Sequence, residues 1–212
     1  MSQSVDTLER KLSSLLDAGH APDHEQVLDA ALAAFLDFGL RRASMGDIAK
    51  RAGISPATLY RRFAQKDDVV AAVALREVQR LLALVDATLD RSAPVEDQLA
   101  DIAVTILRTT RDHPLLRRVI ETEPDFVLPL LTVHAGPTLE LGQAYLQQLF
   151  ARLQAEQRVP PFDAGPLSEL LARLALSLVL TPQTSLPVAD EHAFRALIRE
   201  HVGPALRMRP AS

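Results

Sequence analysis

The sequence predicts an all-α protein of about nine helices with no sheet. Alanine and leucine, which enter helices at little cost, are abundant, whereas aromatic residues make up only 4% of the chain. Apolar residues recur at helical spacing in one segment after another, and no alternation with a period of two is long enough for a strand. Hydrophobic residues make up 48% of the 212 positions, which is sufficient for a packed core and excludes a disordered chain.

The composition also restricts the class of protein. Cysteine is absent, so there is no disulfide framework, thiol nucleophile or cysteine-bound metal, which fits a reducing cytoplasm. The start of the chain lacks the basic residues and apolar run of a signal peptide. The apolar run at 170–180 is too short to cross a bilayer and contains Arg173, so we expect a cytoplasmic protein without a membrane partner.

Charge is distributed unevenly along the chain. The formal net charge is −4, but residues 41–66 contain seven basic side chains and a single acidic one, Asp47. The basic residues of this block are Arg41, Arg42, Lys50, Arg51, Arg61, Arg62 and Lys66. A basic block in an acidic protein indicates a local site for a polyanion, and the alternative is an ordinary solvated face.

The first helices are separated by a break at 19–23, "GHAPD". Before it, leucines at helical spacing allow a short amphipathic helix within residues 1–20, through Leu8, Leu12, Leu15 and Leu16. After it, apolar residues give the segment 24–38 one apolar face, and Gly39 is a typical C-terminal stop.

The segment 44–63 is typical of a helix, a tight turn and a second helix. Ser44 and Asp47 have the spacing of a capping box, in which each side chain bonds the other's backbone amide. Gly53 supplies the positive φ that a sharp turn needs. Ser55 can cap the next helix, and Pro56 suits its first position because the missing N–H costs nothing there.

The second of these helices presents an exposed cationic ridge. Leu59 and Phe63 lie four residues apart and form the buried face, whereas Arg61 points almost opposite to them. The small residues Ala57 and Thr58 flank Arg61, and the shoulders carry Tyr60 and Arg62. Such a helix fits the major groove of double-stranded DNA, whose edges its early residues can approach.

Each exposed side chain suits a particular contact with DNA. Arg61 can donate two hydrogen bonds to guanine, Thr58 can bond a base edge or touch a thymine methyl, and Ala57 leaves room for close approach. Phosphate contacts are expected from Tyr60, Arg62, Lys66 and, at the start of the preceding helix, Ser44.

The remaining chain is predicted to be helical throughout. Helices are expected at 66–90, over about 17 residues ending at 112–114, and at 138–157, 167–180 and 189–206. Four prolines divide the stretch between 112 and 138 into short pieces, namely Pro114, Pro124, Pro129 and Pro137.

The segment 44–73 closely resembles the DNA-binding segment of TetR-family transcriptional regulators. The matching residues are Asp47, Ile48, Ala49, Ala52, Gly53, Ile54, Ser55, Thr58, Leu59, Tyr60, Phe63 and Lys66. With the helix at 24–38 the resemblance covers about 50 residues, and it is far more specific than a lone helix-turn-helix. Gly46 is a mild departure, because glycine loosens a helix or lets the backbone approach DNA.

The resemblance implies an architecture and a set of site residues. After an N-terminal extension, 1–22, come a three-helix helix-turn-helix DNA-binding domain, 23–68, and a larger helical effector-binding and dimerisation domain, 69–212. The DNA-facing helix would be lined by Ser55, Pro56, Ala57, Thr58, Tyr60, Arg61 and Arg62. Lys66 would meet a phosphate, or alternatively only balance Asp67 and Asp68 at the helix start, and Tyr60 can also support the turn.

Members of this family commonly bind a small molecule in the second domain, which corresponds here to about 70–160. Polar residues in this region that can orient a ligand are Arg108, Thr109, Thr110, His113, Glu121, His134, Gln143 and Tyr145, but each is better explained as a surface or helix-end residue, so none is assigned to a pocket. The apolar balance favours a lipophilic effector. Its binding would shift the helix at 66–90 and so change the spacing of two recognition helices.

A homodimer is expected from the last two helices. The helix at 167–180 is apolar around most of its circumference, and the final helix carries a stripe formed by Phe194, Leu197, Ile198 and Leu206. We expect this pair to meet its two-fold copy as a four-helix bundle, although a helix central to its own domain explains the pattern too. The dimer would read a palindromic operator with half-sites about 34–36 Å apart or a multiple of that.

Two other classes are less well supported. The six histidines have no metal-binding arrangement, and the sequence contains no H-E-x-x-H, no G-x-S-x-G and no phosphate-binding glycine loop, so we expect no enzyme, metal or cofactor. A protein-interaction module that kept the fold but lost ligand-controlled DNA binding would have no use for the basic ridge. Repression is expected because most relatives repress, whereas the operator, the target genes and the effector cannot be read from the sequence.

Overall fold

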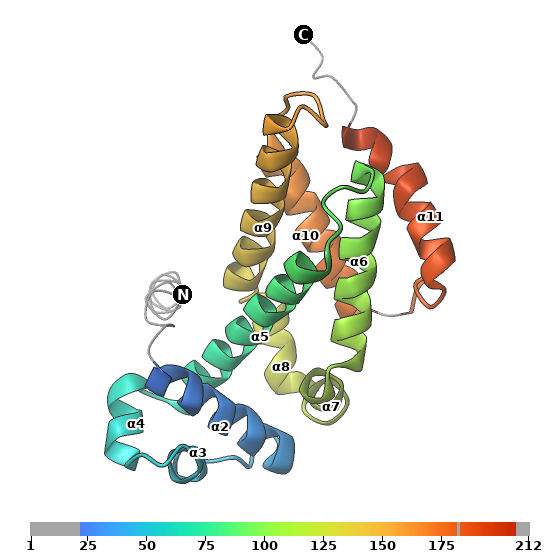
Figure 1. Ribbon diagram of the computed structural model, residues 1–212. Coiled ribbons are helices and arrows are strands. Elements are labelled where there is room, and N and C mark those ends of the chain that lie inside the picture. Colours follow the sequence, from blue (N-terminus) through green and yellow to red (C-terminus); the bar gives the residue numbers. More distant parts are fainter. Residues whose placement is uncertain (1–21, 182, 207–212) are drawn as a thin grey trace. The chain divides into compact units, whose positions relative to one another are not determined.

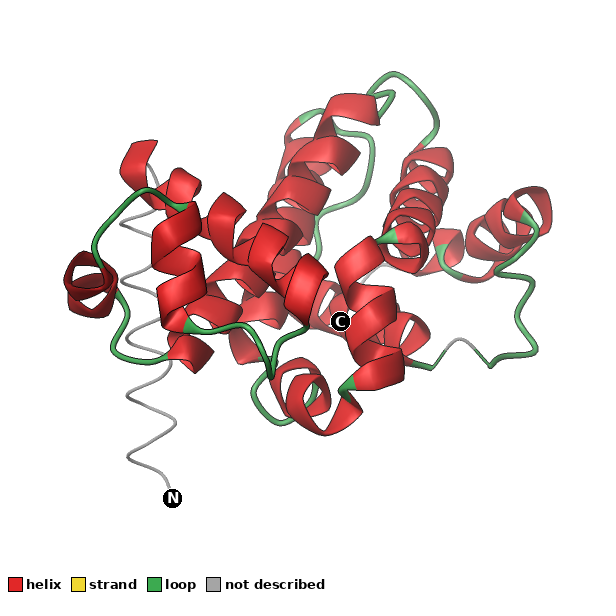
Figure 2. Ribbon diagram, turned by 90° about the horizontal axis from the view of Figure 1, so that it is seen from below, coloured by secondary structure: helices red, strands yellow, loops and turns green. Residues whose placement is uncertain are grey.

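The structure, a computed structural model, describes residues 22–181 and 183–206. Within these ranges it contains ten α-helices, one 3-10 helix and no strand, which confirms the all-α fold (Figure 2). The helices are α2 Pro22–Phe38, α3 Met45–Arg51, α4 Pro56–Arg62, α5 Lys66–Thr88, α6 Val95–Asp112, α7 Pro114–Thr122, α8 Pro124–Leu131, α9 Gly136–Ala155, α10 Ala164–Leu180, α11 Glu191–His201 and η1 Gly203–Leu206. The amphipathic helix expected within residues 1–20 lies outside the described residues.

The helix predicted at 189–206 is divided into two elements. Its regular part, α11, begins after Asp190, whose side chain accepts a hydrogen bond from the Ala193 amide, and it ends at His201. Gly203 and Pro204 follow in the 3-10 helix η1. The apolar spacing predicted a single helix because it continues to Leu206, but Gly and Pro are the poorest residues for a helix interior.

The described chain forms two compact units. The first contains residues up to Val78 together with His113–Thr138, and the second contains Gln79–Asp112 and the residues from Leu139 onward. The helices α7 and α8 therefore belong to the same unit as α2, α3 and α4 (Figure 1). The domain limits 23–68 and 69–212 remain a prediction, because compactness does not define functional domains.

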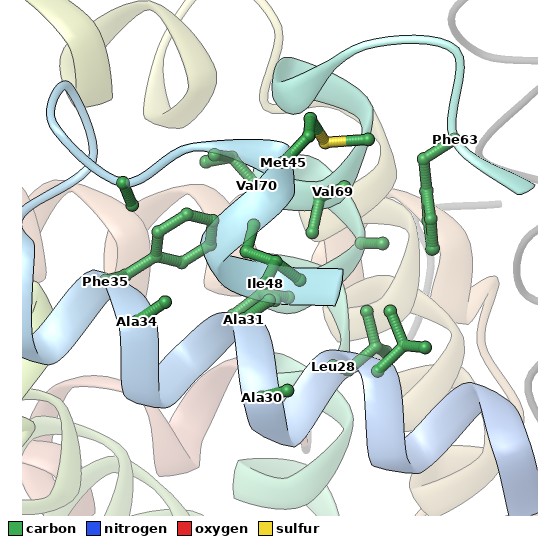
Figure 3. Close-up of a cluster of buried hydrophobic side chains, with 14 of the residues drawn as sticks. Leu28, Ala30, Ala31, Ala34, Phe35, Met45, Ile48, Phe63, Val69 and Val70 are labelled. Atoms are coloured by element: carbon green, nitrogen blue, oxygen red, sulfur yellow. The ribbon is translucent and has the colours of Figure 1, made fainter. Parts of the chain in front are cut away.

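The core of the first unit joins α2, α3, α4 and the first part of α5. In Figure 3, Phe35 and Ala31 of α2 point toward Ile48 of α3 and Val69 of α5, and all four side chains are fully buried. Phe63, directly after α4, is also buried in this cluster. The same cluster takes in side chains of α7 and α8, namely Leu115, Val119 and Val127.

A buried arginine fastens α5 to α2. Arg76 is 4% exposed, and its guanidinium lies 2.8 Å from the Asp29 carboxylate and 2.9 Å from that of Glu77. Glu25 adds a third carboxylate at 3.6 Å. Burying a cation is tolerated only when it is paired and hydrogen-bonded, so these contacts fix α5 against α2.

The second unit is built around α6, which lies between α10 and α11 (Figure 1). Its core contains Phe150 and Leu153 of α9, both fully buried, and Leu99 of α6. The stripe on the last helix is largely part of this core. Three members of the stripe are buried within the chain, namely Phe194, Ile198 at 7% exposure and Leu206 at 2%. The fourth, Leu197, is partly buried against the same cluster.

That burial gives the stripe a partner within the chain, and the expected contact of this helix pair with a two-fold copy stays a prediction. An apolar stripe shows that a helix packs against something, but it does not show whether the partner is in the same chain. Here α11 uses its stripe against α6. The apolar surface that remains exposed on the predicted pair lies on α10, where Leu170 is 66% and Leu174 46% exposed.

His24 makes the first unit sensitive to pH. Its side chain is buried on α2 and its ring lies 5.7 Å from that of Phe63, centroid to centroid. Burial lowers the pKa of His24, with further contributions from Glu25 (raising it), Arg62 and Arg76. His24 therefore binds a proton more readily in the unfolded chain than in the folded chain. The contribution of neutral His24 to the free energy of unfolding is complete above its unfolded pKa of about 6.5, and it is lost as the pH falls from there through the lower folded pKa.

We predict that His24→Phe, which keeps an aromatic ring against Phe63 but cannot be protonated, reduces this acid sensitivity. The measurement is the thermal unfolding midpoint of both proteins at about pH 7.5 and about pH 5.5. The parent should lose more stability than the variant. An equal loss in both proteins would mean that His24 is not the group that takes up the proton.

Candidate nucleic-acid interface

The first helix of the predicted motif, α3, begins with a complete capping box. The Ser44 hydroxyl oxygen accepts from the Asp47 amide at 3.1 Å, and the Asp47 carboxylate accepts from the Ser44 amide at 3.0 Å. The Ser44 hydroxyl also donates to Asp47 at 2.6 Å. These bonds lower the pKa of Asp47, the hydroxyl bond contributing most. The amide and hydroxyl protons of Ser44 are both directed at Asp47, so a phosphate at this position would compete with the Asp47 carboxylate for them.

The turn between α3 and α4 depends on Gly53. Its φ is +68°, and an added Cβ would meet no atom within 4 Å. The requirement for glycine is therefore one of backbone conformation, as the sequence predicted. The Gly53 amide donates to the Lys50 carbonyl at 3.3 Å and the Ile54 amide to the Ala49 carbonyl at 3.0 Å, which satisfies the end of α3.

The helix α4 starts as predicted from the sequence. The Ser55 hydroxyl accepts from the Thr58 amide at 3.1 Å, and Pro56 occupies the first turn. The Thr58 hydroxyl lies 2.9 Å from the Ser55 hydroxyl, and this contact holds it at the start of the helix. Ala57 is exposed next to it.

The outer face of α4 is exposed and cationic. Leu59 and Phe63 are buried beneath it, whereas Tyr60 is 53% exposed and Arg61 and Arg62 are exposed. Among the described residues, the Arg61 side chain has no hydrogen bond or ion pair within the protein. A guanidinium in this position keeps its five donors for a partner outside the chain.

Three other arginines of the block 41–66 have partners within the chain. Arg51 lies 2.6 Å from the Asp37 carboxylate and over the ring of Phe38, and Arg41 lies 3.6 Å from Asp125. The Arg42 Nε donates to the Phe38 carbonyl at 3.2 Å. Two of the seven basic side chains of the block, Arg41 and Arg51, therefore lie beside carboxylates.

Lys66 has a different environment from either of those expected. Its Nζ donates to the Leu40 carbonyl at 2.7 Å and to the Arg41 carbonyl at 2.9 Å, both in the turn between α2 and α3. The sequence suggested a phosphate partner or the neighbouring acids Asp67 and Asp68. The 26-residue separation between Lys66 and Leu40 explains why no local pattern revealed this contact.

Two further residues, which the sequence analysis did not find, contact the end of α2 and the turn that follows it. Glu123, at the corner between α7 and α8, accepts a hydrogen bond from the Arg41 amide at 2.7 Å. Arg118 donates to the Leu36 carbonyl near the end of α2. Both contacts span 82 residues, so only the folded chain brings these groups together.

The polar residues considered for an effector are in varied environments. His113, Glu121 and His134 belong to the first unit, where the His113 Nδ1 caps α7 and its Nε2 lies 3.3 Å from Glu77. In the second unit, Arg108 pairs with Glu191, and the Thr110 hydroxyl bonds the Ile106 carbonyl at 2.7 Å.

Tyr145 is the exception among them. Its hydroxyl is buried and has no hydrogen-bond partner within the described part of the chain. This burial raises the pKa of Tyr145. A buried hydroxyl without a partner is costly, which makes this position suitable for contact with a bound molecule.

The fold and the exposed cationic helix define a helix-turn-helix DNA-binding protein. The family model "Bacterial regulatory proteins, tetR family" matches residues 27–73, and the model "Bacterial Tetracyclin repressor, C-terminal domain" matches residues 95–198. An HTH-type transcriptional regulator of Mycobacterium tuberculosis is 31% identical over 189 residues, which cover 89% of this chain and 86% of that protein. The chain belongs to the TetR family and is a sequence-specific DNA-binding transcriptional regulator.

Two named relatives and one solved structure extend the comparison. The regulator AlkX of M. tuberculosis is 29% identical, covering 86% of this chain and 85% of the relative, and the repressor ComR of Escherichia coli is 27% identical, covering 89% of each. The crystal structure of the TetR-family repressor AlkX from Dietzia, implicated in biodegradation of n-alkanes, has a TM-score of 0.67 with 24% identity and covers 88% of this chain and 96% of that one. It has the same fold. No described helix combines the length and the apolar character needed to cross a membrane.

Proposed function

We propose that this protein is a cytoplasmic, homodimeric repressor that binds a palindromic operator through α4 and is released by a small lipophilic effector. The observation that carries the DNA contact is the exposed face of α4, where Arg61 has no partner among the described residues. In this proposal Ser55, Pro56, Ala57 and Thr58 approach the base edges at the start of α4, and Tyr60, Arg62 and Ser44 contact phosphates. The Lys66 ammonium group has one N–H left for a phosphate after its two carbonyl contacts.

We predict that Arg61→Ala relaxes sequence preference at one base pair of each half-site. A bidentate arginine–guanine contact contributes about 1–3 kcal/mol of discrimination, or about 5- to 150-fold. The measurement is selection of binding sites from random duplex DNA by the purified parent and variant. Arg111→Ala, which removes an exposed arginine of α6, is the matched control and should select the same site as the parent. If the parent enriches no sequence, the proposed function fails.

Dimerisation is proposed through the exposed face of α10. Leu170 and Leu174 lie four residues apart on one side of the helix and are 66% and 46% exposed. Two exposed leucines on adjacent turns form an apolar patch that a two-fold copy can cover. The helix α11 would take part in the dimer with its outer face, because its apolar stripe is already buried against α6.

We predict that Leu170→Glu or Leu174→Glu raises the dissociation constant of the dimer at least about tenfold. In a two-fold dimer each substitution introduces two charges into the interface, one from each subunit. Sedimentation at decreasing protein concentration measures this change. Leu84→Glu, which alters a leucine of α5 that is 43% exposed, should leave the dimer intact. A parent that sediments as a monomer would contradict the proposal.

The effector is proposed to be lipophilic with one polar group. The second unit has an apolar core, and the buried Tyr145 hydroxyl has no partner among the described residues, so a ligand hydroxyl there would supply one. Binding would act on DNA through α5, a continuous helix from Lys66 to Thr88 that begins four residues after α4. The ligand can shift the repressor only by binding one arrangement of the two recognition helices better than the other.

We predict that n-alkanols of increasing chain length release the protein from its operator, and that carboxylates of equal length do so less effectively. Tyr145→Phe should raise the alkanol concentration needed for half-release by up to about tenfold, the effect of one lost hydrogen bond. Thr110→Val is the control, because that hydroxyl already bonds a helix carbonyl. If no alkanol changes operator affinity, this effector class is wrong.

A further inference from the structure

The turn between α2 and α3 determines where the DNA-facing helices begin. Residues 39–43 connect the two helices, and Ser44, the cap of α3, follows at once. Gly39 opens the turn with a φ of +83°, and the Ala43 amide donates to its carbonyl at 3.1 Å. Leu40 and Ala43 are each 2% exposed, so the turn is anchored in the core at both ends.

The C-terminal carbonyls of α2 are capped by basic side chains from outside the helix. Its last turn contains no basic residue, although helix C-termini carry partial negative charge and unpaired carbonyls. The carbonyls of Leu36 and Phe38 accept from Arg118 and Arg42, and those of Leu40 and Arg41 accept from Lys66. Lys66 thus satisfies carbonyls of the turn in the same way that a lysine near the C-terminus of a helix satisfies its last carbonyls.

Glu123 binds the same peptide segment from another element. Its carboxylate accepts from the Arg41 amide at 2.7 Å, while the Lys66 ammonium holds the Arg41 carbonyl at 2.9 Å. The other carboxylate oxygen lies so close to Gly39 that a Cβ there could not fit without displacing it. Arg41 therefore has its N–H and its C=O held by side chains of opposite charge, from α5 and from the α7–α8 corner.

We propose that Lys66 and Glu123 are positioning residues that clamp the turn at 39–43, so that Lys66 supports DNA binding by placing the helix-turn-helix rather than by contacting a phosphate. This inference rests on the proposed DNA face of α4. Two of the three ammonium protons of Lys66 are directed at carbonyls, and a phosphate would have to compete for them. The positioning role gives Glu123, an acid in a DNA-binding unit, a favourable contribution to DNA affinity.

Salt dependence separates the two roles of Lys66. Losing a phosphate contact reduces the slope of log affinity against log salt by about one, whereas a displaced turn lowers affinity without changing the number of phosphates contacted. With the selected operator, Lys66→Met should bind on the order of tenfold more weakly with an unchanged slope. Arg62→Met, which removes an expected phosphate contact, should lower the slope. A slope reduced by about one in Lys66→Met would overturn the inference.

Glu123 provides a test in which electrostatics and positioning predict opposite signs. Removing a negative charge near DNA should tighten binding, but Glu123→Ala should weaken it on the order of tenfold because the Arg41 amide loses its acceptor. Glu123→Gln removes the same charge and keeps an acceptor oxygen, so it should retain most of the affinity. Asp125→Asn, an equal charge change at a side chain that is 88% exposed, should not weaken binding. Equal or tighter binding by Glu123→Ala would overturn the clamp.

The double variant Lys66→Met with Glu123→Ala should lose less than the product of the single losses, because either change alone releases the turn. Circular dichroism measures whether each variant is folded, and titration with excess operator measures the fraction of protein that binds. Together they distinguish unfolding from misplacement of the turn. Should Lys66→Met fold poorly, Lys66→Gln, whose amide can donate to one carbonyl, carries the slope measurement. If Arg61→Ala and Arg62→Met leave DNA binding unchanged while the clamp variants weaken it, the proposed DNA face fails and the clamp stands.

Discussion

The exposed face of α4 depends on the burial of Leu59 and Phe63. A helix of seven residues is not stable by itself in water, because nucleation is costly and few hydrogen bonds repay it. Each of these side chains is almost completely buried, which contributes about 1.5–3 kcal/mol apiece. Their four-residue spacing fixes the rotation of the helix, so Arg61 must point outward. The core of the first unit therefore determines which side chains can meet DNA.

That core is maintained by contacts that also restrict α5. Arg76 is almost fully buried among three carboxylates from α2 and α5, and its loss would leave them close together without a cation. The same helix carries Lys66 at its first residue. One element thus holds α2 at two places, through a buried ion pair and through the carbonyls of the following turn. In the proposed mechanism, a rigid attachment of this kind lets a shift of α5 move the recognition helix as a body.

Sequence reasoning predicted the local features well because their causes are local. The capping box at Ser44, the positive φ at Gly53 and the cap at Ser55 each involve residues within three or four positions of one another. It did not predict the partners of Lys66 or the role of Glu123, because those contacts join residues 26 and 82 positions apart. It also could not assign the stripe on α11, since apolar spacing is the same for a partner in the chain and a partner in another chain.

The charge of the protein adds a further constraint on DNA recognition. The basic block 41–66 is partly offset by Asp37, Glu123 and Asp125, and the whole chain has a net charge of −4. Binding to DNA of any sequence depends mainly on neutralised phosphates, so each carboxylate beside these cations weakens such binding. In the proposed DNA contact, specificity then comes from placing Arg61 and Thr58 correctly against base edges. Under the proposed clamp, fixing the turn before α3 contributes more than one additional phosphate contact, because an error in placement affects every base contact at once.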